Sequence, residues 1–345
     1  MTDKQKFRYK YVKGLSNGLT LARIFTTDIL LNAEGNWLSI CDNAWDFCDD
    51  FALVRKGDKY NFINTEGKYL SVTWFDYAKK FGGDLTLVRL SDKYNFIDTE
   101  GKCISPTPYD KIRECCNGLF VYVQLDGRWN LVGKDGKYLS SIWYDEVMEF
   151  FEGFACVQLN GKWNFIDTKG RLISNTWFDY AWTFIGGLAL VKLNGKYNFV
   201  NNKCEYLSNV WFDDVWEDFH EGFACVKLNR RWNFLNTKGR LLSSVWFDNE
   251  VYFRRGFAYV ELSGKCNFIN SKGKYLSGVW FDDMDCFLED FARVKLNNKW
   301  NFINTKGKYL SDTWYDEAED FDDEGLSLVK LNGEQFYIDK QGKRI

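Results

Sequence analysis

Asparagine, serine and aspartate recur at fixed intervals along this 345-residue chain, and their side chains could form a ladder of identical hydrogen-bonding sites for a ligand. Eight inner copies of one motif carry all three: Asn61, Asn95, Asn130, Asn164, Asn198, Asn233, Asn267 and Asn301; Ser71, Ser105, Ser140, Ser174, Ser208, Ser243, Ser277 and Ser311; Asp76, Asp110, Asp145, Asp179, Asp213, Asp248, Asp282 and Asp316. The alternative is that Asn and Asp bond to the backbone at sheet junctions and corners, as buried polar groups require. Residues present in every copy usually maintain the copy, so we expect this structural role.

Tryptophan recurs in the same motif and could stack on sugar rings. The positions are Trp74, Trp143, Trp177, Trp211, Trp246, Trp280 and Trp314. An aromatic residue at every period is more often part of the core, so we expect these side chains to pack inside.

Residues that differ between the copies are better candidates for recognition, because a surface can vary on a fixed scaffold. The stretches after Trp-Phe-Asp vary most, as in Tyr-Ala-Trp-Thr at 180–183 and Asp-Val-Trp-Glu-Asp at 214–218. We predict a partner-binding hot spot formed by Tyr180, Trp182, Trp216 and Glu217. The alternative is that the two tryptophans fill a local irregularity, such as the extra residue in 214–218.

Few residues could support catalysis. His220 is the only histidine, and we expect it to be a loop residue without a catalytic role. The sequence lacks the phosphate-binding G-x-x-x-x-G-K-[ST], the nucleophile motif G-x-S-x-G and the zinc motif H-E-x-x-H. The carboxylate pairs at 49–50 and 322–323 are typical of solvated turns. We therefore expect no enzyme, no metal and no cofactor.

Ten cysteines lie at scattered places in the motif: Cys41, Cys48, Cys103, Cys115, Cys116, Cys156, Cys204, Cys225, Cys266 and Cys286. A disulfide ladder would use the same two positions in every copy, and a metal site would show C-x-x-C spacing. The absence of both patterns favours a reducing, cytoplasmic compartment.

The distribution of charge and of apolar residues bears on the possible partners. The net charge is -3, and the 45 basic and 48 acidic residues are interspersed, so no basic stripe suggests nucleic acid or an anionic membrane. The first residues lack the apolar core of a signal peptide, and no apolar run approaches a membrane span. We expect neither nucleic acid nor a membrane as a partner.

The motif itself is about 34 residues long and recurs about ten times. Its clearest marker is a glycine, at Gly35, Gly67, Gly101, Gly136, Gly170, Gly239, Gly273, Gly307 and Gly342, with Cys204 in the missing place. Such a period indicates a stack or ring of units too small to bury their own apolar surface. We predict one continuous array over residues 1–345, with a degenerate repeat or cap at 1–50, eight regular repeats at 51–325 and a truncated repeat or cap at 326–345.

The local structure can be predicted from the fifth copy. Residues 154–159 and 162–167 alternate, and Asn160 and Gly161 between them both accept a positive φ, so we expect a two-residue β-hairpin. Gly170 suits a left-handed turn, after which 171–174 is predicted as a third short strand, and 177–184 as an irregular fourth strand.

Pairing across this turn predicts that both faces of the hairpin are largely apolar. Ala155, Val157 and Ile166 share one face, and Cys156 and Phe165 share the other. Such a sheet must be covered on both sides, so we expect an all-β fold of stacked, face-to-face repeats. Degenerate ends favour an open superhelical solenoid, and a closed, propeller-like ring is the alternative.

The repeated residues resemble the bacterial WG-repeat (KWG) family over essentially the whole chain. The resemblance rests on Gly-Lys-Trp-Asn-Phe-Ile-Asp-Thr-Lys-Gly-Arg at 161–171 and its counterparts. The glycine of the Trp-Gly pair is Asn in the inner copies, and the proline-containing stretch of the family is closest at 106–110. The resemblance implies a bacterial or bacteriophage source, a β-repeat array of variable length and no general catalytic activity.

Three functions follow as hypotheses. The first is a non-enzymatic scaffold that binds a protein partner through variable inter-repeat loops. The second is a glycan or small-ligand module with one pocket per repeat, and the third is a structural protein without a dedicated ligand.

Overall fold

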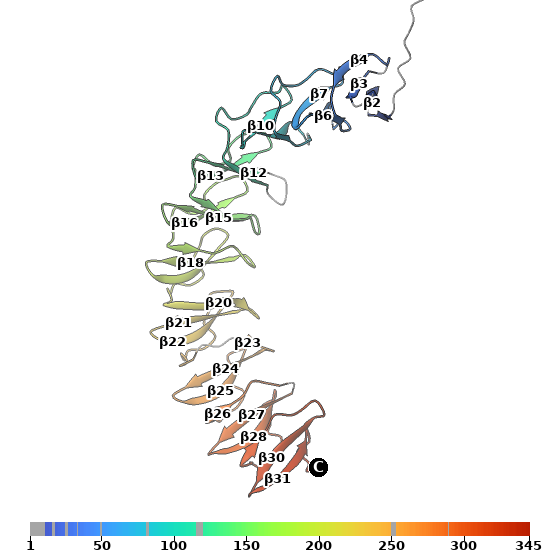
Figure 1. Cartoon of the computed structure of the whole chain (residues 1–345). Helices are drawn as coiled ribbons and strands as arrows, with labels where there is room; N and C mark the ends of the chain where they lie inside the picture. The colour runs from blue at the N-terminus through green and yellow to red at the C-terminus, as the bar shows by residue number, and fades with distance from the viewer. Residues whose placement is uncertain are drawn as a thin grey trace, which may run out of the picture. The chain divides into compact units, whose positions relative to one another are not determined.

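The computed structural model describes residues 11–15, 18–24, 27–32, 34–48, 50–80, 83–114, 120–249, 253–288 and 290–345, and it is built from β-strands (Figure 1). None of these residues belongs to an α-helix. Contacts divide the chain into two compact units, Met1–Trp177 and Phe178–Ile345. Each unit is a series of separate antiparallel sheets.

The basic element is the predicted hairpin of two six-residue strands. In the fifth copy, Ala155 pairs with Ile166, Cys156 with Phe165 and Val157 with Asn164, which is the predicted register. Asn160 and Gly161 both have a positive φ, so the predicted two-residue turn is confirmed. The hairpins are β6 (Phe51–Lys56) with β7 (Lys59–Asn64), β9 (Leu85–Leu90) with β10 (Lys93–Asp98), β12 (Phe120–Leu125) with β13 (Arg128–Gly133), β15 (Phe154–Leu159) with β16 (Lys162–Asp167), β18 (Leu188–Leu193) with β19 (Lys196–Asn201), β21 (Phe223–Leu228) with β22 (Arg231–Asn236), β24 (Phe257–Leu262) with β25 (Lys265–Asn270), β27 (Phe291–Leu296) with β28 (Lys299–Asn304), and β30 (Leu326–Leu331) with β31 (Glu334–Asp339).

The third strand of each sheet precedes the hairpin, so the strand predicted at 171–174 is wrong. The irregular strand predicted at 177–184 does contain a strand, β17 (Tyr180–Ala181). Residues 171–174 make only a single bridging pair, Ile166 with Leu172, because the chain turns away after one contact. The actual third strands follow the recurring aspartate and pair with the first strand of the next hairpin. They are β5 (Asn43–Ala44), β8 (Tyr77–Ala78), β11 (Lys111–Glu114), β14 (Glu146–Val147), β17 (Tyr180–Ala181), β20 (Asp214–His220), β23 (Phe253–Arg254), β26 (Asp283–Met284) and β29 (Glu317–Ala318).

The first sheet differs from the others. It has four strands, β1 (Tyr11–Gly14), β2 (Thr20–Ile24), β3 (Thr27–Leu31) and β4 (Trp37–Ile40), in sequential antiparallel order. At the other end, residues 326–345 contain the complete hairpin β30–β31, which pairs with β29.

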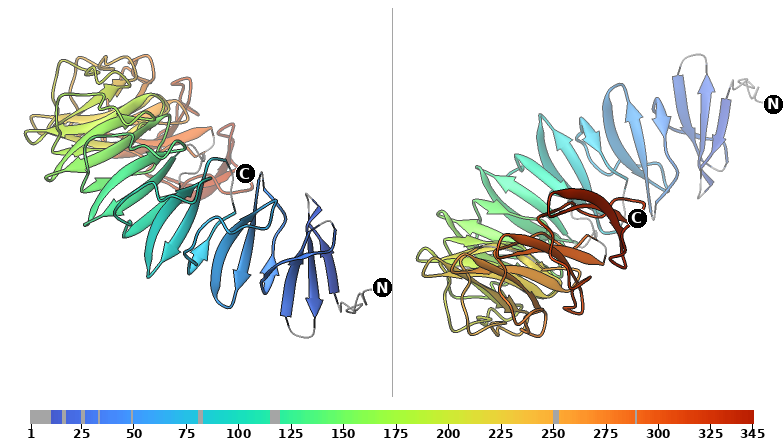
Figure 2. Two further views of the ribbon diagram at one scale, coloured as in Figure 1. Left: turned by 90° about the horizontal axis from the view of Figure 1, so that it is seen from above. Right: turned by 90° about the horizontal axis from the view of Figure 1, so that it is seen from below.

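Neighbouring sheets pack face to face within each unit, and Figure 2 shows this for the blue to green sheets of the first unit. One cluster combines Phe120, Tyr122, Leu131 and Tyr144 from one repeat with Val147, Ala155, Val157 and Ile166 from the next. Burial of each such side chain contributes about 1.5–3 kcal/mol, which an isolated hairpin could not obtain. Within each unit the predicted all-β, open, solenoid-like stacking is therefore confirmed, and the sheets are separate and not closed into a barrel.

The recurring glycine is explained by the stacking. Gly239 has a φ of +75°, and a Cβ placed on it would lie 1.9 Å from the carbonyl oxygen of Leu207 in the preceding repeat. A Cβ placed on Gly101, Gly170, Gly273 or Gly307 would likewise lie 2.4–2.6 Å from the carbonyl oxygen of the equivalent leucine. Both the backbone conformation and the close approach disfavour a larger residue, although Cys204 takes the equivalent place in one repeat with a φ of +58°.

Candidate functional site

The recurring asparagine serves the fold. In all eight inner copies its Nδ2 donates to the carbonyl oxygen of the recurring serine at 2.7–2.9 Å. Its Oδ1 accepts from the backbone N–H of the next residue at 2.7–2.8 Å. The side chain is buried in every copy. The predicted backbone-bonding role is confirmed for asparagine.

The recurring serine closes a local turn. In seven of the eight copies its hydroxyl accepts from the backbone N–H two residues later, at 2.9–3.1 Å, as in Thr73 to Ser71. Ser105 instead donates to the carbonyl oxygen of Thr107 at 2.7 Å. These are local side-chain bonds of the kind that stabilise turns.

The recurring aspartate links two consecutive hairpin turns. Asp213, for example, forms an ion pair with Lys196 from the preceding hairpin and accepts from the backbone N–H of Asn229, in the next hairpin turn, at 2.7 Å. Equivalent backbone bonds occur in all eight copies. The hydrogen bond from Lys196, followed by the bond from Asn229, holds the pKa of the Asp213 carboxyl below its usual value. The structural role is confirmed for aspartate too.

The recurring tryptophans are half-buried, and the aromatic residue that follows each of them is buried in the core. Trp74, Trp143, Trp177, Trp246, Trp280 and Trp314 pack against the apolar clusters. In five repeats the indole also contacts a tyrosine five residues earlier, with ring centroids 5.0–5.3 Å apart. The predicted packing role is confirmed, although each side chain stays partly exposed.

The structure brings Tyr180 and Trp182 together. Both follow Asp179, and the buried Ala181 separates them on β17 and its extension. Their rings are nearly parallel, with an interplanar angle of 9° and centroids 6.2 Å apart. Tyr180 is 38% exposed and Trp182 is 40% exposed.

Trp216 occupies the same repeat position as Trp182. It lies on β20, opposite Cys225, and is 43% exposed. Glu217 is on the same strand, and its side chain lies outside the described part of the structure. The strand changes register between Trp216 and His220, which accommodates the extra residue noticed in 214–218.

A seam position can be defined as the third residue after the recurring aspartate. It faces the next repeat, because its strand partner lies on the face that packs onto that repeat. Among the described residues the seam position is occupied by Trp45, which follows the equivalent Asp42, and by Lys79, Arg113, Met148, Trp182, Trp216, Asp285 and Glu319, while Val251 lies outside the described residues. Trp45 stacks on Tyr60 and packs against the buried cluster around Phe62. Trp45 therefore packs against the core at this position, whereas Trp182 and Trp216 are more exposed there.

Arg113 shows what a cation does at the seam position. Its Nη2 donates to the carbonyl oxygen of Val147 in the next repeat at 2.6 Å, and its Nε lies 3.4 Å from the carboxylate of Glu149. Its guanidinium lies over the rings of Tyr122 and Trp129. It therefore joins two repeats through a charged and stacked contact.

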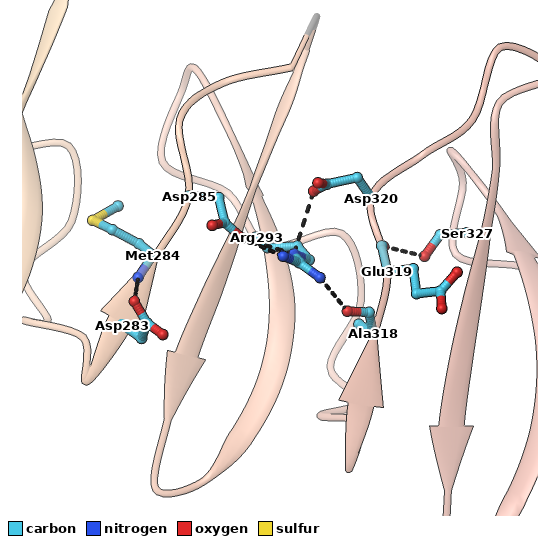
Figure 3. Close-up of polar contacts among 8 residues, drawn as sticks. All are labelled: Asp283, Met284, Asp285, Arg293, Ala318, Glu319, Asp320 and Ser327. Atoms are coloured by element: carbon cyan, nitrogen blue, oxygen red, sulfur yellow. Dashed lines mark hydrogen bonds and ion pairs between the residues drawn. The ribbon is translucent and has the colours of Figure 1, made fainter.

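Arg293 links two repeats in the same way as Arg113 but from another position in the repeat. The sequence analysis did not identify this residue. It lies on β27 and donates to the carbonyl oxygen of Ala318 at 2.5 Å (Figure 3). Asp285 of its own repeat and Asp320 of the next lie on either side, with the closest contacts at 2.6 and 3.3 Å. Its guanidinium lies over Trp300. Ala318, Asp320 and Trp300 are the repeat equivalents of Val147, Glu149 and Trp129.

The structure provides little for metal or thiol chemistry. Within the described ranges no group of three His, Cys, Asp or Glu side chains could hold a metal ion. Burial raises the pKa of the Cys156 thiol to about 12, so this side chain is a neutral apolar filler at physiological pH. In the part of the chain that the structure describes, no helix is long and apolar enough to cross a membrane.

The stacked sheets define an all-β protein of tandem antiparallel repeats. The family profile of the WG containing repeat matches residues 131–163, 165–197, 212–232, 268–300 and 302–334. These five segments match the WG repeat, so the resemblance drawn from the sequence is confirmed for them. No curated protein matches the sequence.

Three solved structures that align with this chain are only distantly similar to it. A eukaryotic initiation factor aligns with a TM-score of 0.32 and 9% identity over 98% of this chain and 92% of that chain. PorZ, a surface component of the type-IX secretion system of Porphyromonas gingivalis, aligns with a TM-score of 0.25 and 11% identity over 98% of this chain and 58% of that chain. Kluyvelomyces marxianus Hsv2 gives a TM-score of 0.28 and 11% identity over 73% of this chain and 94% of that chain. At these scores none of the three bears on function.

Proposed function

We propose that this protein is a non-enzymatic repeat scaffold that binds a protein partner through side chains that vary from repeat to repeat. The observation that carries the proposal is the parallel pair of Tyr180 and Trp182, with both rings more than one third exposed. Aromatic side chains that are already held in place lose little entropy on binding and often dominate protein interfaces. Trp216, at the same repeat position, extends this candidate surface.

The recurring polar residues support the proposal indirectly. Asn, Ser and Asp bond to backbone groups of their own or the next repeat, so their hydrogen-bonding groups are used by the fold. Recognition is then left to the varying residues of the short strands. We place the protein in the cytoplasm, since its cysteines follow no disulfide pattern.

The second candidate function is glycan or small-ligand binding, because a flat aromatic pair can also stack on a sugar ring. A module with one pocket per repeat would need repeated polar groups that face a ligand. The repeated asparagine instead donates to a serine carbonyl oxygen in all eight copies. We therefore favour the protein partner.

The test is a quantitative pull-down from lysate of the native host under reducing conditions. The test variant carries Tyr180→Ser, Trp182→Ser and Trp216→Ser, and the buried Ala181 and Val191 are retained. The matched control carries Val72→Ser, Tyr77→Ser and Leu90→Ser, which also removes three exposed apolar side chains. We expect one protein near stoichiometry with the native chain and the control, and its loss with the test variant. Equal recovery with all three, or no specific partner, would contradict the proposal.

A further inference from the structure

Exposed cationic side chains gather along one edge of the second unit. This basic edge consists of Lys238, Arg240, Arg254, Arg255, Lys272, Lys274, Lys306 and Lys308. The six residues other than Arg254 and Arg255 belong to three consecutive glycine turns, at 236–241, 270–275 and 304–309. Within the described part of the chain, no residue of the basic edge forms an ion pair. Basic and acidic residues are interspersed in the sequence, but the fold gathers these cations in one place.

The stacking of the repeats brings the three turns side by side. A Cβ placed on Gly273, in the second turn, would lie 2.6 Å from the carbonyl oxygen of Leu242, which directly follows the first turn. A Cβ placed on Gly307, in the third turn, would lie 2.4 Å from the carbonyl oxygen of Leu276, which directly follows the second. Each turn therefore adjoins the one before it, and their cations form a continuous row.

The loop before β24 adds Arg254 and Arg255 to this row. Arg254 pairs with Phe257, and Phe257 pairs with Asn270, the first residue of the second turn. The two arginines therefore lie at the same end of the sheet as that turn. Both are exposed.

Few carboxylates oppose this charge. In the described parts of the loops that precede the three hairpins, the carboxylates are those of Glu221 and Asp290. Glu221 accepts from the backbone N–H groups of Arg255 and Gly256 at 3.0 and 2.9 Å. Glu289 lies outside the described residues. The edge therefore keeps an excess of positive charge.

The glycine turn itself does not require such charge. In the first unit the equivalent turns neutralise their own cations, since Lys68 pairs with Glu66 at 2.8 Å and Lys137 pairs with Asp135 at 3.5 Å. In the second unit Lys238, Lys272 and Lys306 occupy the position of these carboxylates. The basic edge is thus a feature of three particular repeats and not of the fold.

An apolar side chain follows the last cation of each turn. These side chains are Leu241, Tyr275 and Tyr309, and Leu241 and Tyr309 are each 37% exposed. The rings of Tyr275 and Tyr309 contact Trp280 and Trp314, with centroids 5.1 and 5.3 Å apart. The basic edge therefore offers one partly exposed apolar side chain per repeat, held in place by its neighbours.

We propose that the basic edge binds an acidic segment of a protein partner that adopts the polyproline II conformation and has an apolar residue at every third position. This conformation has about three residues per turn and rises about 3.1 Å per residue, so every third side chain returns to the same side after about 9 Å. Stacked sheets lie about 10 Å apart. One apolar side chain of the segment can therefore meet each of Leu241, Tyr275 and Tyr309, while the intervening carboxylates pair with the cations.

A protein segment fits this surface better than a single-stranded nucleic acid does. Nucleic acids are held by aromatic rings on which successive bases stack, and Leu241 provides no ring. The basic edge shares no residue with the surface of Tyr180, Trp182 and Trp216. This proposal and the proposed function can therefore fail independently.

A synthetic peptide tests the spacing. The probe is a fluorescein-labelled peptide of three Glu-Glu-Leu triplets, measured by polarisation against the full chain at low salt. The control peptide has the same composition with its three leucines adjacent. We expect saturable binding of the probe that weakens as salt is added, and at least fivefold weaker binding of the control. Equal affinity for the two peptides would overturn the proposal.

Charge-reversal variants locate the binding. The test variant carries Lys238→Glu, Lys272→Glu and Lys306→Glu, and the turn tolerates this residue because Glu66 and Glu100 occupy the same position in the first unit. The charge-matched control carries Lys68→Glu, Lys102→Glu and Lys137→Glu, at a position that is naturally Glu205 in another repeat.

We expect the test variant to bind the probe at least tenfold more weakly than the native chain, with an unchanged thermal unfolding midpoint, and the control to bind it as the native chain does. Unchanged binding in the test variant, or an equal loss in both variants, would overturn the proposal. Oligodeoxythymidylate that bound more tightly than the probe and displaced it would also overturn it, because the edge would then be a nucleic-acid surface.

Discussion

The guanidinium of Arg293 lies 3.3 Å from the carboxylate of Asp320, which belongs to the following repeat. Arg113 and Glu149 form the equivalent ion pair at 3.4 Å, although Arg113 comes from the seam position and Arg293 from the first hairpin strand. Both guanidiniums also donate to the backbone carbonyl oxygen of the next short strand. One joint between repeats is thus built from two different sequence positions.

Arg293→Ala should weaken this joint. The loss of its hydrogen bonds and of its stacking on Trp300 should cost about 1–2 kcal/mol, since the partners are partly exposed and screened by solvent. Arg293→Leu should recover most of that loss, because Leu53, Leu87, Leu190 and Leu328 occupy the same repeat position. Hydrogen exchange in β27 to β31 measures the effect, and equal protection in the native and Arg293→Ala chains would refute it.

Asn164→Ala should destabilise the array more than a surface change does. It leaves the carbonyl oxygen of Ser174 and the N–H of Phe165 without their side-chain partner in a buried place, at a cost of about 2–3 kcal/mol. Asn175→Ala, at an exposed residue of the same repeat, is the control and should change the urea midpoint little. Equal midpoints for the two variants would contradict the structural role of the recurring asparagine.

The substitutions Gly239→Ala and Gly195→Ala distinguish the two reasons for a glycine, which are the positive φ and the close approach of another backbone. Both residues have a φ between +75° and +79°, but only at Gly239 would a Cβ meet another atom, the Leu207 oxygen. Gly195→Ala should cost about 1 kcal/mol for the left-handed backbone, and Gly239→Ala should cost about 2 kcal/mol more. Urea unfolding of the two variants gives the comparison, and similar losses would show that close approach does not matter.

The hairpins, their register and their stacking are predictable from the sequence, because a residue such as Asn160 before Gly161 specifies a turn and the strands alternate around it. The short third strand is predictable only in part, because the irregular strand expected at 177–184 contains it but its bounds and its partner could not be predicted. A two-residue strand such as Tyr180–Ala181 has no periodicity of its own, and its partner belongs to the next repeat. The joint of Arg293 is also hidden, since Asp320 is 27 residues away and the position is apolar in most repeats.

Stability should fall in acid through the recurring aspartates. Bonding to a lysine and to a backbone N–H lowers the pKa of the carboxyl in Asp76, Asp110, Asp213, Asp282 and Asp316. A lowered folded-state pKa means that this stabilisation is complete above the ordinary aspartate pKa of about 3.9 and is lost as the pH falls through the folded value.

Asp213→Asn tests that dependence. The variant should unfold at a lower temperature than the native chain at pH 7, and the difference should shrink as the pH falls through the lowered pKa of the folded state, where the native carboxyl also becomes neutral. Thermal scans between pH 2 and pH 7 give the comparison. A difference independent of pH would mean that the charge of Asp213 contributes nothing.

The most direct test of the proposed scaffold is to measure partner recovery and thermal unfolding of the double variant Trp182→Leu, Trp216→Leu in one preparation. Leucine keeps an apolar contact at the seam position but removes the exposed aromatic surface. We expect the partner to be lost while the midpoint shifts by no more than about 4 °C, equivalent to about 1 kcal/mol. A much larger drop in the midpoint, or undiminished recovery of the partner, would show that the two tryptophans serve the core and that recognition lies elsewhere.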